Sequence, residues 1–248
     1  MKGVSIMTQT ILITGASSGI GHAIATRLLN PKYRLVLIGY QHMKGLKDIE
    51  EKAQKEGVQV TSFSCDLSKF QEVEDLFKKL EDLGLLPDYL INDAGISIIG
   101  LLQDLSFEEW NQILSTNLSS VFATCKLSIP HMVKKQEGKI LNISSVWGNV
   151  GASCEVAYSA TKGGLNAFTK ALGKELAPSN ISVNAIACGA IHTSMNSFLS
   201  KEEEADLLEE IPIGRMIEPE EVADLCYHLL QSPSSLTGQI ITLDGAWI

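Results

Sequence analysis

Short apolar runs and amphipathic stretches alternate along the chain. The apolar runs have the length and composition of strands, and they predict strands at 10–14, 34–39, 58–65, 88–92, 139–144, 180–186 and 239–243. Between them, apolar residues recur at helical spacing near 19–29, 42–56, 69–83, 106–135, 155–177 and 218–231. This alternation predicts an α/β fold: a doubly wound parallel sheet of seven strands, with helices on both faces, forming a single domain over 1–248.

Two segments depart from the regular pattern. Pro130 lies inside the long helical stretch at 106–135 and is expected to kink or break its last part. The irregular stretch from 189 to 217 separates the sixth strand from the last helix. Because NSFLSKEEEADLLEEIP, at 196–212, has an amphipathic pattern, we interpret 189–217 as a mobile substrate lid whose acidic run faces solvent.

Composition limits the classes of function. The chain has 248 residues, of which 45% are hydrophobic, enough for the core of one α/β domain. No apolar run reaches the length of a membrane span, and MKGVSIMTQT lacks the apolar core of a signal peptide, so we expect a cytoplasmic protein. A formal charge of −9 argues against binding to nucleic acid or to anionic membranes. The five cysteines show no Cys-x-x-Cys or Cys/His spacing, which indicates reduced thiols and no metal site.

A glycine-rich loop follows the first expected strand. In ILITGASSGIGHAIATRLL, at 11–29, Gly15 permits a tight turn, Gly19 lets the backbone approach a pyrophosphate, and Gly21 allows close packing of helix on strand. The N-terminus of the next helix then offers free N–H groups and a positive dipole end to phosphates. The loop predicts a dinucleotide site, although a glycine turn without a ligand can have the same sequence.

The segment SVWGNVGASCEVAYSATK, at 145–162, combines a serine, a tyrosine and a lysine. Tyr158 and Lys162 are four residues apart in an expected helix, so their side chains share one face. An ammonium group at that spacing should lower the pKa of the phenol from about 10, toward a value useful for proton transfer. Ser145 follows the fifth strand, where an open α/β sheet usually has its site. By itself, the Tyr-x-x-x-Lys spacing is also common in solvated surface pairs.

Several motifs occur together and in a characteristic order: TGASSGIG at 14–21, NDAG at 92–95, TNLSSVF at 116–122 and ISS at 143–145. With the Tyr-x-x-x-Lys pair, they make the chain resemble the short-chain dehydrogenase/reductase family over nearly its whole length. The resemblance implies a Rossmann fold and four catalytic residues, Asn117, Ser145, Tyr158 and Lys162. It assigns to Ser145 the binding of a carbonyl oxygen and to Tyr158 the role of general acid. Lys162 would lower the pKa of the tyrosine and hold the nicotinamide ribose, and Asn117 would keep a proton relay connected to solvent.

The same resemblance implies a set of cofactor contacts, namely Gly15, Ser17, Ser18, Gly19, Ile20, Gly21, Tyr40, Asp66, Leu67, Asn92, Ala94, Gly95, Tyr158, Lys162, Gly189, Ile191 and Thr193. Asp66 has an alternative role as the N-cap of the following helix. Two positions depart from the family pattern. Asp93 replaces an asparagine, and Cys188 replaces a proline, which is expected to loosen the loop over the nicotinamide.

The end of the second strand is expected to select the cofactor. An acidic residue there would bind the ribose hydroxyls of NAD, but the matching position is Gly39, followed by Tyr40. Because no carboxylate repels a 2′-phosphate, we favour NADP(H), with NAD(H) as the alternative. His42 or Lys44 would supply a positive charge, unless both are simply solvated.

Two bacterial subgroups share further phrases with the chain. EEWNQILSTNLSSVF resembles 3-oxoacyl-[acyl-carrier-protein] reductases, which implies acyl carrier protein as a partner, with Lys134 and Lys135 at one docking position and Ser179 in place of a second basic residue. The segment around GASCEV lies in the expected substrate wall at 147–156. It resembles the matching segment of reductases that act on an aminopentanone group of elongation factor P. The alternatives are an NAD-linked alcohol dehydrogenase and a non-catalytic cofactor-binding scaffold. Trp247 and Ile248 at the C-terminus fit a contact in a homo-oligomer, a dimer or tetramer, or burial within their own subunit.

Overall fold

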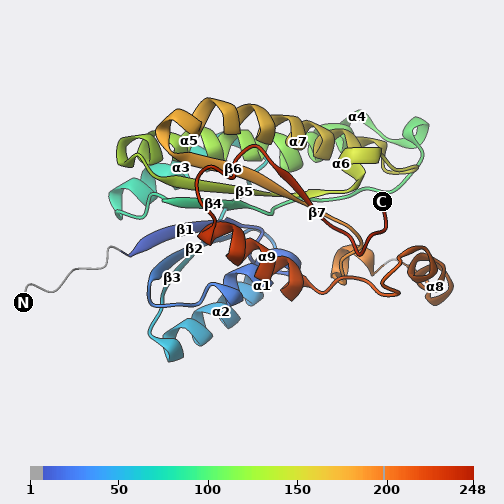
Figure 1. Ribbon diagram of the computed structural model, residues 1–248, viewed down its shortest axis with the longest axis horizontal. Coiled ribbons are helices and arrows are strands. Elements are labelled where there is room, and N and C mark those ends of the chain that lie inside the picture. Colours follow the sequence, from blue (N-terminus) through green and yellow to red (C-terminus); the bar gives the residue numbers. More distant parts are fainter. Residues whose placement is uncertain (1–7, 198) are drawn as a thin grey trace, which may run out of the picture.

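One parallel sheet forms the centre of the molecule. The computed structural model describes residues 8–197 and 199–248, and within them lie the strands β1 (Gln9–Thr14), β2 (Tyr33–Gly39), β3 (Gln59–Ser64), β4 (Tyr89–Asn92), β5 (Gly138–Ser145), β6 (Ile181–Cys188) and β7 (Ile240–Leu243). All neighbouring strands are parallel, in the order β3-β2-β1-β4-β5-β6-β7 (Figure 1). The structure confirms the doubly wound parallel sheet, and each strand begins and ends within two residues of its predicted bounds.

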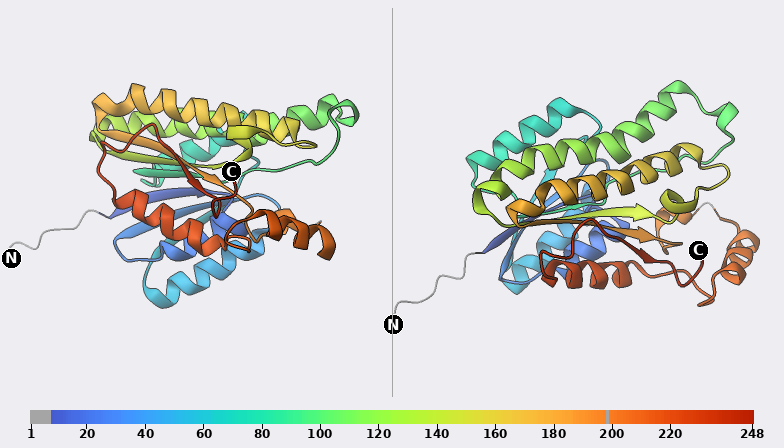
Figure 2. Two further views of the ribbon diagram at one scale, coloured as in Figure 1. Left: turned by 45° about the vertical axis from the view of Figure 1, so that its right-hand side comes forward. Right: turned by 45° about the horizontal axis from the view of Figure 1, so that its top comes forward.

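Helices cover the two faces of this sheet in separate layers, as Figures 1 and 2 show. One layer contains α1 (Gly19–Arg27), α2 (Met43–Glu56) and α9 (Pro219–Gln231), and the other contains α3 (Phe70–Asp82), α5 (Ser120–Lys135) and α7 (Val156–Leu176). Successive residues of β1 belong to different cores, because Ile11 and Ile13 pack in the first layer and Leu12 in the second. Burial on both faces explains why the strands are nearly continuous apolar runs.

The strand order reverses between β1 and β4, and this reversal determines where a ligand can bind. From β1 the chain moves outward to β2 and β3, and then returns to β4 on the other side of β1. The loops that leave β1 and β4 therefore diverge at the C-terminal edge of the sheet and leave a crevice between them. Thr14, Asn92, Ser145 and Cys188 end four adjacent strands at this edge.

The long helix expected at 106–135 is divided. It consists of α4 (Phe107–Leu114), a π-helical turn (Ser115–Ser119) and α5, so the helix is disturbed at Asn117. The expected break at Pro130 is wrong, since α5 continues through it to Lys135. Because Pro130 has no backbone N–H, the carbonyl group of Lys126 lacks its helical hydrogen bond. Both residues are exposed, so water can replace that bond.

The segment at 189–217 contains more regular structure than its sequence indicates. It includes α8 (Lys201–Glu210), which begins with a capping box between Ser200 and Glu203, and a β-bridge between Ile191 and Ile217 closes the loop at its base. The acidic first turn of α8 is mainly exposed, as expected, and also suits the positive end of the helix dipole. In the part of the chain that the structure describes, no helix is long and apolar enough to cross a membrane.

Candidate active site

The predicted catalytic side chains converge at the C-terminal edge of the sheet. A hollow of about 230 Å³ at this edge is lined by Ser145, Tyr158 and Lys162. Five residues of the predicted cofactor site also line it: Ile20, Gly95, Gly189, Ile191 and Thr193. The structure therefore brings the loops after β1, β4, β5 and β6 around one space.

Each catalytic side chain is held by a different local feature. Ser145 is the last residue of β5, and its Oγ accepts a hydrogen bond from the Trp147 backbone N–H at 3.1 Å, so the hydroxyl keeps its own hydrogen to donate to Tyr158 or to a ligand. Tyr158 and Lys162 follow one turn apart at the start of α7, on the face turned to the hollow. Lys162 is buried, and its Nζ donates to the Ile143 carbonyl oxygen at 2.8 Å.

The expected effect of Lys162 on Tyr158 is absent, because the pKa of Tyr158 is raised. Burial is the main cause, and the negative charge of Glu155 adds to it, while hydrogen bonding with Ser145 acts in the opposite direction. The ammonium is turned toward Ile143 and lies 5.5 Å from the centre of the tyrosine ring, too far to offset burial. The phenol is therefore protonated at neutral pH, which is the form that a proton donor needs.

Asn117 does not line the hollow but supports one of its walls. Its Oδ1 accepts from the Ile96 N–H at 2.8 Å, and its Nδ2 donates to the Ile96 carbonyl oxygen at 2.8 Å and to Thr161 Oγ1 at 3.3 Å. These bonds fix the loop after β4 to α7 beside Lys162. The sequence indicated a relay role for Asn117 but not this clamp, and neither Ile96 nor Thr161 carried a signal that would have revealed it.

The glycine loop has the geometry expected of a pyrophosphate site. Gly15 and Gly19 have positive φ angles, of 69° and 55°, and a Cβ on Gly21 would lie 2.5 Å from the Gly15 carbonyl oxygen. The N-cap of α1, Ser18, makes no side-chain capping bond, and the first turn has no acidic residue. The open N-terminus therefore fits the phosphates of a dinucleotide. Ser17 packs against the start of α2. A Cβ built on Gly45 would lie 2.0 Å from the Ser17 carbonyl oxygen.

Gly45 is a close-approach residue that the sequence interpretation missed. A glycine inside a helix is unfavourable, so its presence in the stretch at 42–56 was the available signal.

The residues expected at the adenosine end of the cofactor lie around the ends of β2 and β3. Tyr40 is exposed just after β2, and Leu67 is buried after β3. Asp66 accepts hydrogen bonds from the Ser68 N–H and hydroxyl at 3.1 and 2.6 Å, and pairs with Lys69 at 3.1 Å. Asp66 therefore forms a turn before α3 and is not its N-cap, which is Lys69.

The loop after β4 is fixed by Thr14, the last residue of β1. The backbone N–H groups of Asp93 and Ala94 both donate to Thr14 Oγ1, at 3.0 and 3.1 Å. Asn92 braces the sheet instead, since its amide donates to Asn142 Oδ1 at 2.9 Å. Asp93 enters the hollow with its carboxylate close to Gly21, and burial raises its pKa to about 7 despite the opposing charge of Lys162.

Cys188 is fixed by strand pairing at the end of β6, so the loosening expected from the lost proline stays a prediction for the loop beyond it. It is buried, it is the last paired residue of the strand, and its carbonyl oxygen accepts from the Val146 N–H at 2.9 Å. Pairing with both neighbouring strands supplies the order that a proline would otherwise provide. Beyond it, Thr193 reaches the glycine loop, with its Cγ2 3.4 Å from a Cβ built on Gly19.

An aromatic and acidic wall of the hollow was not identified as a unit from the sequence. Trp147 and Trp247 meet edge to face, with ring centres 4.9 Å apart, and both line the hollow. Trp247 is thus in contact with its own subunit. Beside them, Ser97 donates to Glu155 Oε1 at 2.6 Å. These four residues are separated by up to 150 positions in the chain, so no local pattern could predict that they meet.

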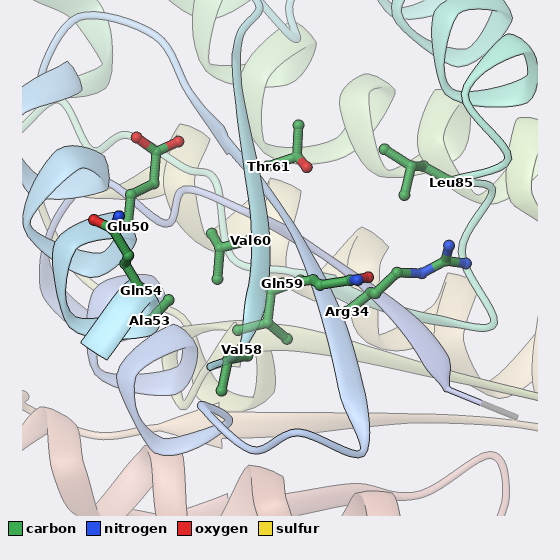
Figure 3. Close-up of a pocket in the computed structure, with 10 residues that line it drawn as sticks. Arg34, Glu50, Ala53, Gln54, Val58, Gln59, Val60, Thr61 and Leu85 are labelled. Atoms are coloured by element: carbon green, nitrogen blue, oxygen red, sulfur yellow. The ribbon is translucent and has the colours of Figure 1, made fainter. Parts of the chain in front are cut away.

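A second hollow, of about 380 Å³, lies away from this chemistry (Figure 3). It surrounds the edge strand β3, and its lining includes Arg34, Glu50, Gln54, Gln59 and Thr61. It contains none of the predicted site residues. Although it is larger, the smaller hollow with the convergent polar groups is the candidate active site.

Comparison with known proteins agrees with this geometry. The chain is 37% identical to an uncharacterized oxidoreductase, YmfI, of Bacillus subtilis, over 97% of this chain and 99% of that protein. It is also 37% identical to the 3-oxoacyl-[acyl-carrier-protein] reductase FabG of Aquifex aeolicus, over 98% of both. Among solved structures, an actinorhodin polyketide ketoreductase with NADPH superposes with a TM-score of 0.91 at 32% identity, over 98% of both chains.

The model of the family described as short chain dehydrogenase matches residues 9–204, which is most of the chain. The glycine loop, the strands β1 to β6 and the Ser145, Tyr158 and Lys162 cluster lie within that match. The chain therefore belongs to the short-chain dehydrogenase family, whose members are oxidoreductases that bind NAD(P)H.

Proposed function

We propose that this oxidoreductase reduces a carbonyl group to an alcohol with NADPH, and that its substrate is a 3-oxoacyl thioester of acyl carrier protein. The observation that carries the reaction type is the convergence of Ser145, Tyr158 and Lys162 on one hollow, beside a glycine loop that fits a pyrophosphate. Full-length similarity to 3-oxoacyl-[acyl-carrier-protein] reductases supports the thioester.

The residues around the hollow suit each step of a reduction. NADPH, when bound, supplies the hydride for the carbonyl carbon. Ser145 has a hydroxyl hydrogen with which to hold the carbonyl oxygen, and Tyr158 is kept protonated by burial and gives its proton to the same oxygen. Lys162, fixed by its hydrogen bond to the Ile143 carbonyl oxygen, would hold the nicotinamide ribose, and the proton returns to Tyr158 from solvent along the wall that Asn117 supports.

Replacement of Tyr158 tests the reaction type. Tyr158→Phe removes the proton donor but keeps the ring, so we expect turnover to fall by about 10³-fold or more while the dissociation constant of NADPH changes little. Turnover is followed by oxidation of NADPH with acetoacetyl thioester, and binding by fluorescence of the cofactor. Turnover of the variant at the wild-type rate would rule out Tyr158 as the general acid.

A preference for NADPH follows from the end of β2. Gly39 offers no carboxylate against a 2′-phosphate, and His42 and Lys44 are exposed at the start of α2. We expect NADPH to bind more tightly than NADH, by about tenfold. Lys44→Ala should weaken binding of NADPH but not of NADH. Equal affinities, or tighter NADH, would favour the NAD-linked alcohol dehydrogenase.

The proposed docking of acyl carrier protein on Lys134 and Lys135 has little support within one chain. Both lie at the end of α5 that leads into the start of β5 (Figure 1). The hollow is lined by residues at the opposite, C-terminal edge of the sheet. The charge of Lys135 is also engaged by Asp88. The acidic carrier would therefore need another basic surface, or one formed by a second subunit.

A second candidate substrate is the aminopentanone group on elongation factor P, favoured by the wall that contains Glu155. This carboxylate lies in the hollow near Tyr158, and the structure gives it no ion pair within residues 8–197 and 199–248. With Trp147 and Trp247 beside it, the wall suits an ammonium group better than a thioester chain.

A direct comparison of the two substrates separates these candidates. Acetoacetyl thioester and ketone-bearing elongation factor P are assayed with wild type and Glu155→Gln. If the amine is the natural group, Glu155→Gln should raise KM for the protein substrate by about tenfold and leave the thioester unaffected. Efficient use of the thioester by both forms supports the first candidate. Binding of NADPH without turnover of either substrate, or of a panel of small ketones, points to a cofactor-binding scaffold.

We also propose that the chain forms a dimer or tetramer. Phe107 and Phe122 are 84% and 49% exposed, on α4 and α5, which is unusual for such large apolar side chains. Light scattering should give a mass of two or four chains, and Phe122→Glu should lower it. A monomer at micromolar concentration would contradict this proposal.

A further inference from the structure

The carboxylate of Asp93 lies directly against the glycine loop. Hydrogen bonds from the Asp93 and Ala94 N–H groups to Thr14 hold the backbone in place. A Cβ built on Gly21 would lie 2.6 Å from Asp93 Oδ2, and one built on Gly15 would lie 2.9 Å from it. The backbone of Gly21, in the first turn of α1, acts on this carboxylate and opposes the rise in pKa that burial causes. An acidic group is therefore packed beneath the loop that fits the cofactor phosphates.

Few groups near Asp93 can balance its charge. From α7 it faces Tyr158 and Lys162, from β6 Cys188, and from α9 Cys226, while α1 contributes the Gly21 backbone. Burial raises the pKa of the phenol and of both thiols, so these three groups are neutral near pH 7. Lys162 is the cation that acts on Asp93, but the structure records no ion pair between the two among its described residues.

We propose that Asp93 is a positioning residue that couples the affinity for a dinucleotide to its own state of protonation. When ionised, it interacts with the Gly21 backbone at the α1 N-terminus and places a negative charge beneath the site of the pyrophosphate. Both effects oppose an anionic ligand, because a helix N-terminus binds anions through its backbone N–H groups and through its dipole. When protonated, Asp93 is neutral and no longer opposes the binding of an anionic ligand.

Proton binding by Asp93 then gives a specific dependence on pH. Burial raises the pKa of Asp93 to about 7, so the ionised form predominates only above neutral pH. Affinity for the dinucleotide should be highest below pH 7 and should fall as the pH rises through 7. By linkage, binding at pH 7.5 to 8 should take up a proton from solution. The inference rests on the proposed function only in requiring that a dinucleotide binds.

The test compares wild type with Asp93→Asn, which keeps the shape and removes the charge. The dissociation constant of NADPH is measured by its fluorescence from pH 6.5 to 9, without a carbonyl substrate. The ratio of the wild-type constant to that of Asp93→Asn should be near one at pH 6.5 and should rise to the order of tenfold at pH 9. Taking the ratio cancels titration of the 2′-phosphate of NADPH, and NADH provides a second check.

Proton uptake gives an independent readout that a purely structural role would not move. Calorimetry in buffers of different ionisation enthalpy should show uptake of a substantial fraction of a proton by wild type at pH 7.5, and none by Asp93→Asn. Asp88→Asn is the matched control, because Asp88 directly precedes β4 whereas Asp93 directly follows it. This control variant should retain the wild-type proton uptake.

Three results would overturn the inference: a ratio that does not change with pH, equal proton uptake by wild type and Asp93→Asn, or weaker binding by Asp93→Asn at every pH. The last would assign Asp93 a structural role only. Failure here with normal turnover leaves the proposed function intact, whereas the absence of any dinucleotide binding removes both.

Discussion

The short strand β4 has an aspartate directly before it and another directly after it, and their surroundings are opposite. Asp88 accepts from the Thr10 N–H at 2.9 Å and contacts His131 and Lys135, and although burial raises its pKa, these partners outweigh burial and lower it. For Asp93, the charge of Lys162 and the backbone of Gly21 do not outweigh burial, which raises its pKa to about 7. The two aspartates are separated by the four residues of β4, yet one is stabilised in its charged form at one edge of the sheet and the other in its neutral form at the opposite edge.

The difference between Asp88 and Asp93 reflects two roles of the sheet, stability at its N-terminal edge and ligand binding at its C-terminal edge. At the N-terminal edge, the charge joins β1, β4 and α5, and every partner comes from the chain itself. At the C-terminal edge, the chain leaves charges and N–H groups incompletely matched, because a ligand is expected to complete them. An edge built only for stability satisfies its polar groups, and an edge built for binding keeps some of them available.

The largest expected effect comes from exchanging one lysine at each edge. Lys162→Met removes the cation of the hollow that would hold the nicotinamide ribose, so we expect turnover to fall by about 10²- to 10⁴-fold. Lys135→Met, the matched change at the other edge, should leave turnover of the folded enzyme unchanged. Circular dichroism confirms folding of both. Similar losses in the two variants would show that the edges do not divide the tasks in this way.

Loss of the charge at Asp88 should lower stability. Asp88→Asn leaves Lys135 and His131 without their anion, and we expect the free energy of unfolding to fall by about 1–3 kcal/mol at pH 7. Since the pKa of Asp88 is lowered in the folded state, its contribution is present above its ordinary value of 3.8 and disappears as the pH falls below that value. Urea denaturation at pH 7 and pH 3.5 measures the difference. A loss that persists undiminished at pH 3.5 would contradict the electrostatic explanation.

Asp93 should have the opposite effect on stability. Its pKa is raised in the folded state, so the folded protein binds more protons than the unfolded chain, and stability falls as the pH rises from about 4 to about 7. Asp93→Asn should therefore match wild type near pH 4 and exceed its stability by about 1–2 kcal/mol at pH 8. Thermal unfolding across this range is the measurement. A variant less stable than wild type at pH 8 would show that the charged carboxylate is already balanced.

The smallest expected effect is that of His131. Its ring nitrogen lies 3.1 Å from Asp88, but the side chain is partly exposed and Lys135 remains when it is replaced. His131→Gln should cost about 0.5 kcal/mol or less at pH 7. Denaturation in urea measures it against Asp88→Asn. A loss as large as that of Asp88→Asn would make His131 the main partner.

The fold could be predicted almost completely, because a parallel sheet buried on both faces imposes a simple pattern on the chain. The strands were predicted within two residues, and the disturbed helix at Asn117 agrees with the resemblance to the family. Pro130 was misjudged because its position on the exposed side of α5 is not visible in a local pattern. The helix α8 was missed because its capping box lies in a stretch dominated by acidic residues.

The site was predicted in its members but not in its electrostatics. Tyr158 and Lys162 do share a helix face, yet the pKa of the phenol is shifted in the direction opposite to that expected. The orientation of the ammonium depends on the carbonyl group of Ile143 in β5, which lies nineteen residues earlier in the chain. The wall formed by Ser97, Glu155 and the two tryptophans likewise depends on three distant segments, around 97, 147–155 and 247.

Local chemistry in the sequence determined the sheet, the glycine loop and the identity of the candidate reacting side chains, because each depends on residues that are close together in the chain. Tertiary structure alone decided which of these groups are buried, which carbonyl group Lys162 meets, and why two aspartates at the ends of one strand differ in charge. Burial and electrostatic fields are sums over neighbours in space, and those neighbours come from every part of the chain.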